Sequence, residues 1–286
     1  MNTKSPPIST RSASTPESTF PAADDATQSR PARFTVDATN WTITTADGRT
    51  ISWFDDEGFA LLSRTWLAAS WQRKYSYQFE WLGRPIIQLP TDVMMMQDLV
   101  SRIRPTLIVE TGIAHGGSAV LHASLLKLVH DGAGVPAGRP HVVAVDIEIR
   151  PHNRAALDRH PLRSMMTLVE GSSTDPSVVD RIRSLVRPDD RVLVVLDSNH
   201  LRDHVLAELE AYAPLVSPGS VVVVMDGVMR ELAPLPAADP TWRTDNPLAA
   251  IDAFRATQLG RSFSVDHRYD GYACTHSPDG VLVREG

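Results

Sequence analysis

The chain has 286 residues, 42% of them hydrophobic, so we expect a well-buried core in one large domain or two small ones. Its formal net charge of −6 argues against a partner that is nucleic acid or a membrane surface, because both favour a basic face. The single cysteine, Cys274, excludes an internal disulfide, and together with the lack of an apolar membrane span or secretory signal it suggests a cytoplasmic protein.

The first third of the chain predicts a tail followed by a small N-terminal extension. Residues 1–32 are rich in Ser, Thr, Pro, Ala and Asp and can bury little apolar area, so we expect a disordered tail. Residues 34–52 alternate between apolar and polar side chains around an Asp-Gly turn, which predicts a hairpin. Residues 55–73 have helical spacing, and residues 75–85 form an aromatic-rich connector. The predicted extension therefore covers residues 33–90.

From residue 91 to residue 286 the pattern predicts one α/β domain. Helices are predicted over residues 93–103, 118–130, 152–159, 176–186 and 202–213. Strands are predicted over residues 106–110, 141–146, 166–170, 191–197 and 220–226, with a possible edge pair at 263–266 and 280–283. Continuous apolar runs such as Val221 to Val224 are typical of strands buried on both sides. We therefore expect a mostly parallel, seven-stranded sheet with helices on both faces.

The stretch from Val109 to Ser118 joins a predicted strand to a helix through a glycine turn. Glycines let a ligand approach the backbone closely, and the start of a helix offers free N–H groups. The spacing of Gly112, Gly116 and Gly117 differs from the G-x-G-x-x-G pattern that suits a pyrophosphate, and no lysine follows as in a P-loop. The turn therefore indicates a small-molecule site for a ligand without a pyrophosphate.

Every predicted parallel strand ends in a carboxylate; these residues are Glu110, Asp146, Glu170, Asp197 and Asp226. Ligands of open α/β sheets bind at this edge. Helix capping would explain any one of these acids, but it explains the whole set less well. An acid at the position of Asp146 typically binds the hydroxyls of a ribose. A cofactor with a ribose and no phosphate, S-adenosylmethionine, therefore fits better than a dinucleotide.

Asp197 and Asp226 end strands that are consecutive in the chain, so we expect them to lie close together. Two carboxylates with open positions suit Mg²⁺, although helix caps or a solvated acidic mouth would give the same pattern. His200, three residues after Asp197, could accept a proton from a substrate hydroxyl, or it could be a capping or surface histidine. No 2-His-1-carboxylate spacing indicates iron oxygenase chemistry.

Several motifs resemble the cephalosporin hydroxylase-like family across residues 70–285. They are Lys74–Tyr77, Trp81–Pro90, Glu110–Ser118, Val145–Ile147, Arg150–Asn153, Gly171–Ser173, Leu196–His200 and His204–Val216. Members of this family look like S-adenosylmethionine-dependent O-methyltransferases with a divalent metal, which act on sugars, antibiotics and other secondary metabolites. The resemblance implies a Rossmann-like class I methyltransferase fold and a small-molecule hydroxyl acceptor.

A more distant resemblance, to the catechol O-methyltransferase type, implies roles for individual residues. The residues implied to contact the cofactor are Gln88, Glu110, Gly112, Ala114, Gly116, Ser118, Asp146, Ser172, Ser173 and Asp197. Asp197 and Asp226 would bind the metal, and His200 would act with Asp197 in catalysis. The family supplies two adjacent polar ligands at the later strand end, whereas Met225-Asp226-Gly227 supplies one. The site could be completed by water or Asn199, or lost.

Two alternatives remain open from the sequence: an oxidoreductase of natural-product biosynthesis, and a non-catalytic partner subunit with a methyltransferase fold. The residues Tyr75, Tyr77, Phe79 and Trp81, with the segment 228–247, could close over the acceptor or form an aromatic core. The resemblance also implies a homo-oligomer. The acceptor itself is not specified by the sequence.

Overall fold

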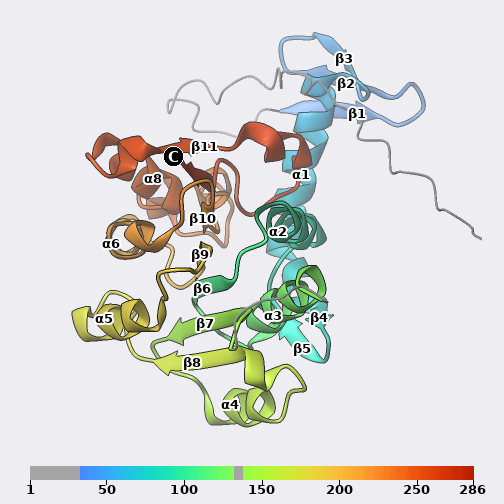
Figure 1. Cartoon of the computed structure of the whole chain (residues 1–286). Helices are drawn as coiled ribbons and strands as arrows, with labels where there is room; N and C mark the ends of the chain where they lie inside the picture. Colours follow the sequence, from blue (N-terminus) through green and yellow to red (C-terminus); the bar gives the residue numbers. More distant parts are fainter. Residues whose placement is uncertain (1–32, 132–137) are drawn as a thin grey trace, which may run out of the picture.

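The computed structural model describes residues 33–131 and 138–286, so the predicted disordered tail, 1–32, lies outside the described residues. The N-terminal extension begins with a three-stranded antiparallel sheet, set apart from the main body in Figure 1. Its strands are β1 (Phe34–Asp37), β2 (Thr42–Thr45) and β3 (Thr50–Ser52). The segment 34–52, predicted as a hairpin, is therefore a three-stranded meander.

The helix α1 (Asp56–Gln72) leads from this small sheet toward the main body, as the spacing of residues 55–73 predicts. The aromatic connector is ordered into a 3-10 turn, Tyr75–Gln78, and a hairpin of β4 (Phe79–Trp81) and β5 (Arg84–Ile86). This hairpin lies in the segment that the sequence pattern predicted only as an aromatic-rich connector.

The main body contains the expected seven-stranded sheet. Its strands are β6 (Leu107–Thr111), β7 (His141–Asp146), β8 (Met166–Glu170), β9 (Val192–Leu196), β10 (Val221–Val224), β11 (Phe263–Val265) and β12 (Val281–Arg284). The strand order is β11-β12-β10-β9-β6-β7-β8, and β12 alone runs antiparallel to its neighbours. The last two strands extend the sheet beyond β10, with β12 inserted between β10 and β11.

Helices cover both faces of the sheet, as the buried strands require (Figure 1). One face packs against α2 (Pro90–Ile103), α3 (Gly117–Val129) and α4 (Pro151–Asp158). The other packs against α5 (Pro176–Leu185), α6 (Arg202–Tyr212) and α8 (Pro247–Ala256). Successive strand residues, such as Ile108 and Val109, alternate between the two cores. The helix α8, which follows the short helix α7 (Met229–Leu232), was not predicted from the sequence pattern.

The strand order reverses between β6 and β9. These two strands are parallel neighbours in the sheet, although β7 and β8 lie between them in the sequence. A crevice opens at the carboxyl ends of the strands at such a switch point, and ligands of open α/β sheets bind there. The glycine turn after β6 and the acids after β9 and β10 all lie at this edge. Among the described residues, no helix is both long and apolar enough to span a membrane.

Candidate active site

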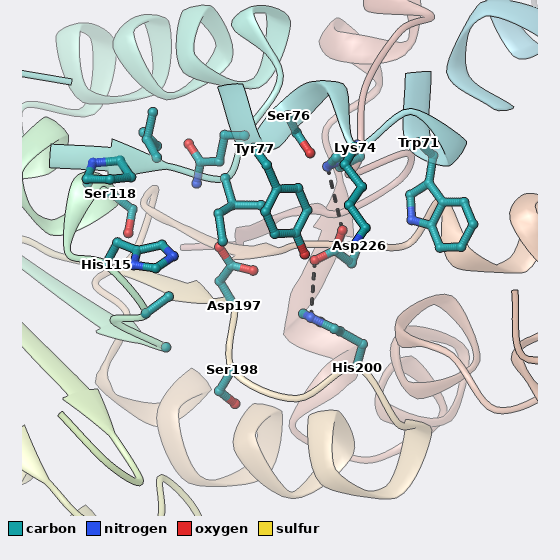
Figure 2. A pocket seen from close by; sticks show the side chains of 18 of the residues that line it. Trp71, Lys74, Ser76, Tyr77, His115, Ser118, Asp197, Ser198, His200 and Asp226 are labelled. Atoms are coloured by element: carbon teal, nitrogen blue, oxygen red, sulfur yellow. Dashed lines mark ion pairs between the residues drawn. The ribbon is translucent and has the colours of Figure 1, made fainter. Parts of the chain in front are cut away.

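A cavity of about 540 Å³ lies at this edge of the sheet (Figure 2). Its walls come from the glycine turn, the segments after β9 and β10, and the connector of the N-terminal extension. Residues that line it include Trp71, Lys74, Tyr77, Gln88, Gly112, Ala114, His115, Ser118, Asp197, Ser198, His200, Asp226, Met229, Trp242 and His276. The cavity therefore joins the predicted cofactor turn and the predicted metal residues in one space.

The glycine turn lies against the backbone that follows β9. Gly112 has a φ of 90°, and its N–H donates to the carbonyl of Val145 at 2.8 Å. A Cβ added at Gly112 would lie 1.9 Å from the carbonyl oxygen of Asp197, so only glycine permits this approach. The carboxylate of Asp146 accepts hydrogen bonds from the backbone N–H groups of Ile113 and Ala114 at 2.8 and 3.0 Å. Asp146 thereby fixes the shape of the turn.

Asp197, His200 and Asp226 converge at the other part of the cavity, with one ligand atom from each lying within 4.8 Å of the others. Nε2 of His200 lies 3.4 Å from Oδ2 of Asp226, the pair joined by a dashed line in Figure 2. Asp226 has a φ of 58°, a left-handed conformation that is uncommon outside glycine. Such strain is concentrated at functional sites.

The electrostatics of this cluster suit a cation. Burial, and then the nearby carboxylates of Asp226 and Glu110, raise the pKa of Asp197 well above its ordinary range. Within the described part of the chain, no lysine or arginine forms an ion pair with Asp197 or Asp226. The carboxylates of Asp197 and Asp226 offer oxygen ligands that suit a divalent cation, and the imidazole of His200 lies beside them.

Gln88 gives a second indication of a polar ligand. It lines the cavity and is 2% exposed, and its side-chain amide makes no hydrogen bond of ordinary length among the described residues, although it lies close enough to the Asp197 carboxylate to lower the pKa of Asp197 in part. A buried amide with its hydrogen bonds incomplete is unfavourable, so a ligand that carries donors and acceptors would satisfy it. Ser118, in the first turn of α3, lines the same space.

The structure divides the predicted site residues into two groups. Those that line the cavity are Gln88, Gly112, Ala114, Ser118, Asp197, His200 and Asp226. Those that do not line it are Glu110, Gly116, Asp146, Ser172 and Ser173. In the second group, Glu110 is fully buried against Nδ1 of His122 at 3.1 Å, and the hydroxyl of Ser173 lies 3.2 Å from Nε2 of His204. The hydroxyl of Ser172 lies 3.1 Å from that of Thr174.

The aromatic residues of the connector are also divided. Tyr77 lines the cavity, whereas Tyr75 packs edge-on against Phe79 and the indole N–H of Trp81 donates to Ser124 at 3.0 Å. The cavity also contains Trp71, at the end of α1, which the sequence pattern did not assign to the site. Trp71 contacts Trp242, a residue of the predicted segment 228–247, edge-on with ring centroids 5.6 Å apart.

Lys74 and His276 were likewise missed as site residues. Lys74 lies in a family motif, but nothing in its spacing indicates which way its side chain points. His276 lies in a loop 50 residues after Asp226, and no pattern in the sequence connects the two. The structure places both on the cavity wall.

The sheet order, the glycine turn at the switch point and the polar cavity define a class I methyltransferase fold. The chain belongs to the family described as Rhamnosyl O-methyltransferase/CmcI, whose model matches residues 73–285. This confirms the resemblance deduced from the motifs and identifies the chain as an O-methyltransferase.

Named relatives agree with this membership. A rhamnosyl O-methyltransferase of Mycobacterium tuberculosis is 31% identical over 202 residues, which cover 68% of this chain and 73% of the relative. A rhamnosyl O-methyltransferase of Mycobacterium leprae is 27% identical over 212 residues, covering 72% and 82%. Among solved structures, the apo form of CmcI has a TM-score of 0.50 at 19% identity, covering 73% of this chain and 77% of CmcI. A CmcI structure with Mg and SAM has the same TM-score at 18% identity and covers 73% and 78%.

Proposed function

We propose that this protein transfers a methyl group from S-adenosylmethionine to a hydroxyl of a sugar or sugar-containing secondary metabolite, with the help of Mg²⁺ or another divalent cation. One observation carries the proposal: a single cavity contains the glycine turn after β6 and the Asp197–His200–Asp226 cluster after β9 and β10. A methyl donor on the turn and an acceptor at the cluster would therefore meet in one space.

The cofactor would lie over the turn. Gly112 and Ala114 offer close backbone approach, Ser118 offers a hydroxyl, and the buried amide of Gln88 offers both a donor and an acceptor. When bound, S-adenosylmethionine supplies a methyl group that is already activated, so the chain has mainly to position the acceptor oxygen and remove its proton. Asp146 keeps the turn in shape through two backbone hydrogen bonds.

Asp197 and Asp226 would hold the cation, which when bound lowers the pKa of a hydroxyl beside it. His200 is the proposed base, because its Nε2 faces the cavity next to the two carboxylates. Asp226, 3.4 Å away, would stabilise the imidazolium that forms when His200 accepts the proton. Because the cation would bind the acceptor hydroxyl, Asp197 would orient the acceptor through the cation that it holds.

The acceptor would lie between the cluster and the aromatic residues of the opposite wall. Trp71, Tyr77 and Trp242 offer flat apolar surfaces, while Lys74 and His115 add polar groups. A sugar ring has apolar C–H faces and polar edges, so such a mixed wall suits it. The rhamnosyl name of the relatives supports a sugar as the acceptor.

The alternatives left open by the sequence have less support. A nicotinamide-dependent oxidoreductase would need space for a pyrophosphate, and the glycine spacing does not provide the usual fingerprint. A non-catalytic subunit would have no need to keep Asp197, His200 and Asp226 within 4.8 Å of one another on a cavity. Family membership also supports the methyltransferase.

The test is the transfer of an isotopically labelled methyl group from S-adenosylmethionine to a panel of rhamnosides and other glycosides, followed by mass spectrometry. We expect a labelled product with Mg²⁺ and little or none with a chelator. Asp197→Ala should abolish turnover and leave S-adenosylhomocysteine binding near normal. Full activity of Asp197→Ala would refute the role of the cation.

Two further properties follow as proposals. We infer self-association, supported by exposed aromatic residues on the N-terminal extension: Trp41 is 52% and Phe54 78% exposed. Light scattering would measure it, and a monomer at micromolar concentration would contradict it. A cytoplasmic location is supported by the single, unpaired Cys274.

A further inference from the structure

Asp226 has histidines on both sides of its carboxylate. Oδ2 lies 3.4 Å from Nε2 of His200, and Oδ1 lies 3.7 Å from Nδ1 of His276. The backbone of Asp226 is left-handed, with a φ of 58°. A conformation of this kind persists only when the surrounding structure holds it. The neighbouring segments must therefore fix both the backbone and the direction of the carboxylate.

The loop of residues 275–280 is attached to the chain both before and after Asp226. Three hydrogen bonds join the two segments: Val224 N–H to the carbonyl of Gly280 at 2.8 Å, Val228 N–H to the carbonyl of His276 at 3.1 Å, and the Ser277 hydroxyl to Sδ of Met225 at 3.1 Å. Because these bonds bracket Asp226, the position of the loop determines where the carboxylate lies.

Asp92, in the first turn of α2, binds the same loop through its carboxylate. Its carboxylate has no solvent exposure and accepts hydrogen bonds from the Thr275 hydroxyl and, at 3.0 Å, from the backbone N–H of His276. The side chain of His276 is itself only 8% exposed. The imidazole is therefore held in place before any ligand arrives.

We propose that His276 is a positioning residue of the cation site: its buried imidazole fixes Oδ1 of Asp226, so that Oδ2 faces the space shared with Asp197 and His200. The inference rests on the proposed function. Residues around metal ligands commonly orient them and raise metal affinity. The orientation of Asp226 matters particularly here, because its neighbour Met225 offers no carboxylate and is bonded into the loop.

The test is the affinity of the full chain for Mn²⁺, measured by electron paramagnetic resonance. This measurement does not depend on turnover. His276→Ala should weaken Mn²⁺ binding about 10- to 100-fold. The affinity for S-adenosylhomocysteine, measured by calorimetry, should stay within about twofold, because His276 does not lie at the glycine turn. His276→Asn keeps an N–H donor and should recover part of the Mn²⁺ affinity. If His276→Ala folds poorly, His276→Asn takes its place as the test variant.

Two controls separate positioning from loop packing. Ser277→Ala removes the contact with Met225 and keeps the imidazole, and His152→Ala removes an exposed histidine on α4. His152→Ala should bind Mn²⁺ as the wild type does. Ser277→Ala should lose much less affinity than His276→Ala, because the two backbone hydrogen bonds that hold the loop remain. The inference is overturned if Ser277→Ala loses as much affinity as His276→Ala, or if His276→Ala binds normally. A wild type that binds no Mn²⁺ would overturn the cation assignment of the proposed function, and this inference with it.

Discussion

His200 and Gly112 show how single residues could control chemistry and shape in this cavity. His200 presents Nε2 to the carboxylate cluster, which suits a base acting on a bound hydroxyl. Gly112 allows the turn to touch the loop after β9. A change at His200 should therefore alter the turnover rate, and a change at Gly112 should alter the stability of the fold and the affinity for the cofactor.

Replacing His200 tests the proposed base. His200→Ala should lower kcat about 10²- to 10⁴-fold, the usual contribution of a positioned acid or base. The affinity for S-adenosylhomocysteine should change less than about twofold, because the glycine turn is untouched. Steady-state kinetics and calorimetry measure the two. A variant with normal kcat would show that another group accepts the proton.

Replacing Gly112 tests the contact between the turn and the loop. Gly112→Ala would place a Cβ 1.9 Å from the Asp197 carbonyl oxygen at a φ of 90°, so we expect lower stability and loss of S-adenosylhomocysteine binding. Gly83→Ala is the matched control, because Gly83 has a φ of 81° and open space around it. It should cost only about 1–2 kcal/mol from backbone strain and keep binding. Equal loss in thermal unfolding and binding for both variants would refute the steric account.

The helix α1 and the segment after β10 form the acceptor side of the cavity through Trp71 and Trp242. Each tryptophan comes from a different part of the chain, so the wall depends on how the N-terminal extension packs on the main domain. Their edge-on contact keeps the two rings together.

Trp242→Ala should raise the KM for the glycoside acceptor about 2- to 10-fold, since aromatic pair contacts contribute about 0.5–1.5 kcal/mol beyond burial. The KM for S-adenosylmethionine should stay nearly constant. Trp66→Ala is the control, because Trp66 is on α1 but contacts Tyr75 and does not line the cavity. If both KM values rise together in Trp242→Ala, the residue does not belong to the acceptor side.

The sequence predicted the central strands well, since long β-branched runs such as Val221 to Val224 occur where both faces of a sheet are covered. It missed α8, whose apolar residues follow a loop of Pro and Ala, and it missed the hairpin of β4 and β5. Among site residues, those at strand ends were predictable because strand ends share one edge. His276 was not, because it reaches the cavity only through the tertiary position of its loop.

The direction of a side chain at a strand end is harder to predict than its position. Glu110 follows the expected pattern, but its carboxylate turns into the core toward His122. Asp146 reaches back to the glycine turn and bonds to its backbone. Side chains alternate between the two faces along a strand, and the backbone changes direction where the strand ends. A pattern of residue types therefore cannot specify which of these acids faces the ligand.

Across the whole molecule, α6 connects the loops that follow β8 and β9. Nε2 of His204 lies 3.2 Å from both Ser173 and Ser198, and 3.5 Å from the buried carboxylate of Glu208. The interaction with Glu208 raises the pKa of His204, although burial lowers it in part. The protonated imidazole therefore stabilises the folded state.

This linkage has a defined sign. Because the folded-state pKa of His204 is raised above the ordinary value of 6.5, its contribution is complete below that value and is lost as the pH rises through the folded-state pKa. The free energy of unfolding of the wild type relative to His204→Gln should thus be larger near pH 6 than near pH 9. Urea unfolding at both values measures it. A difference that grows with pH would contradict the assignment.

The account depends above all on which cofactor binds the glycine turn. Isothermal titration calorimetry of the wild type with S-adenosylhomocysteine and with NAD⁺ measures this directly, and Gly112→Ala provides the link to the turn. We expect S-adenosylhomocysteine to bind with one site per chain, NAD⁺ to give no heat of binding, and Gly112→Ala to lose the signal. Binding of NAD⁺ in preference to S-adenosylhomocysteine would contradict the account.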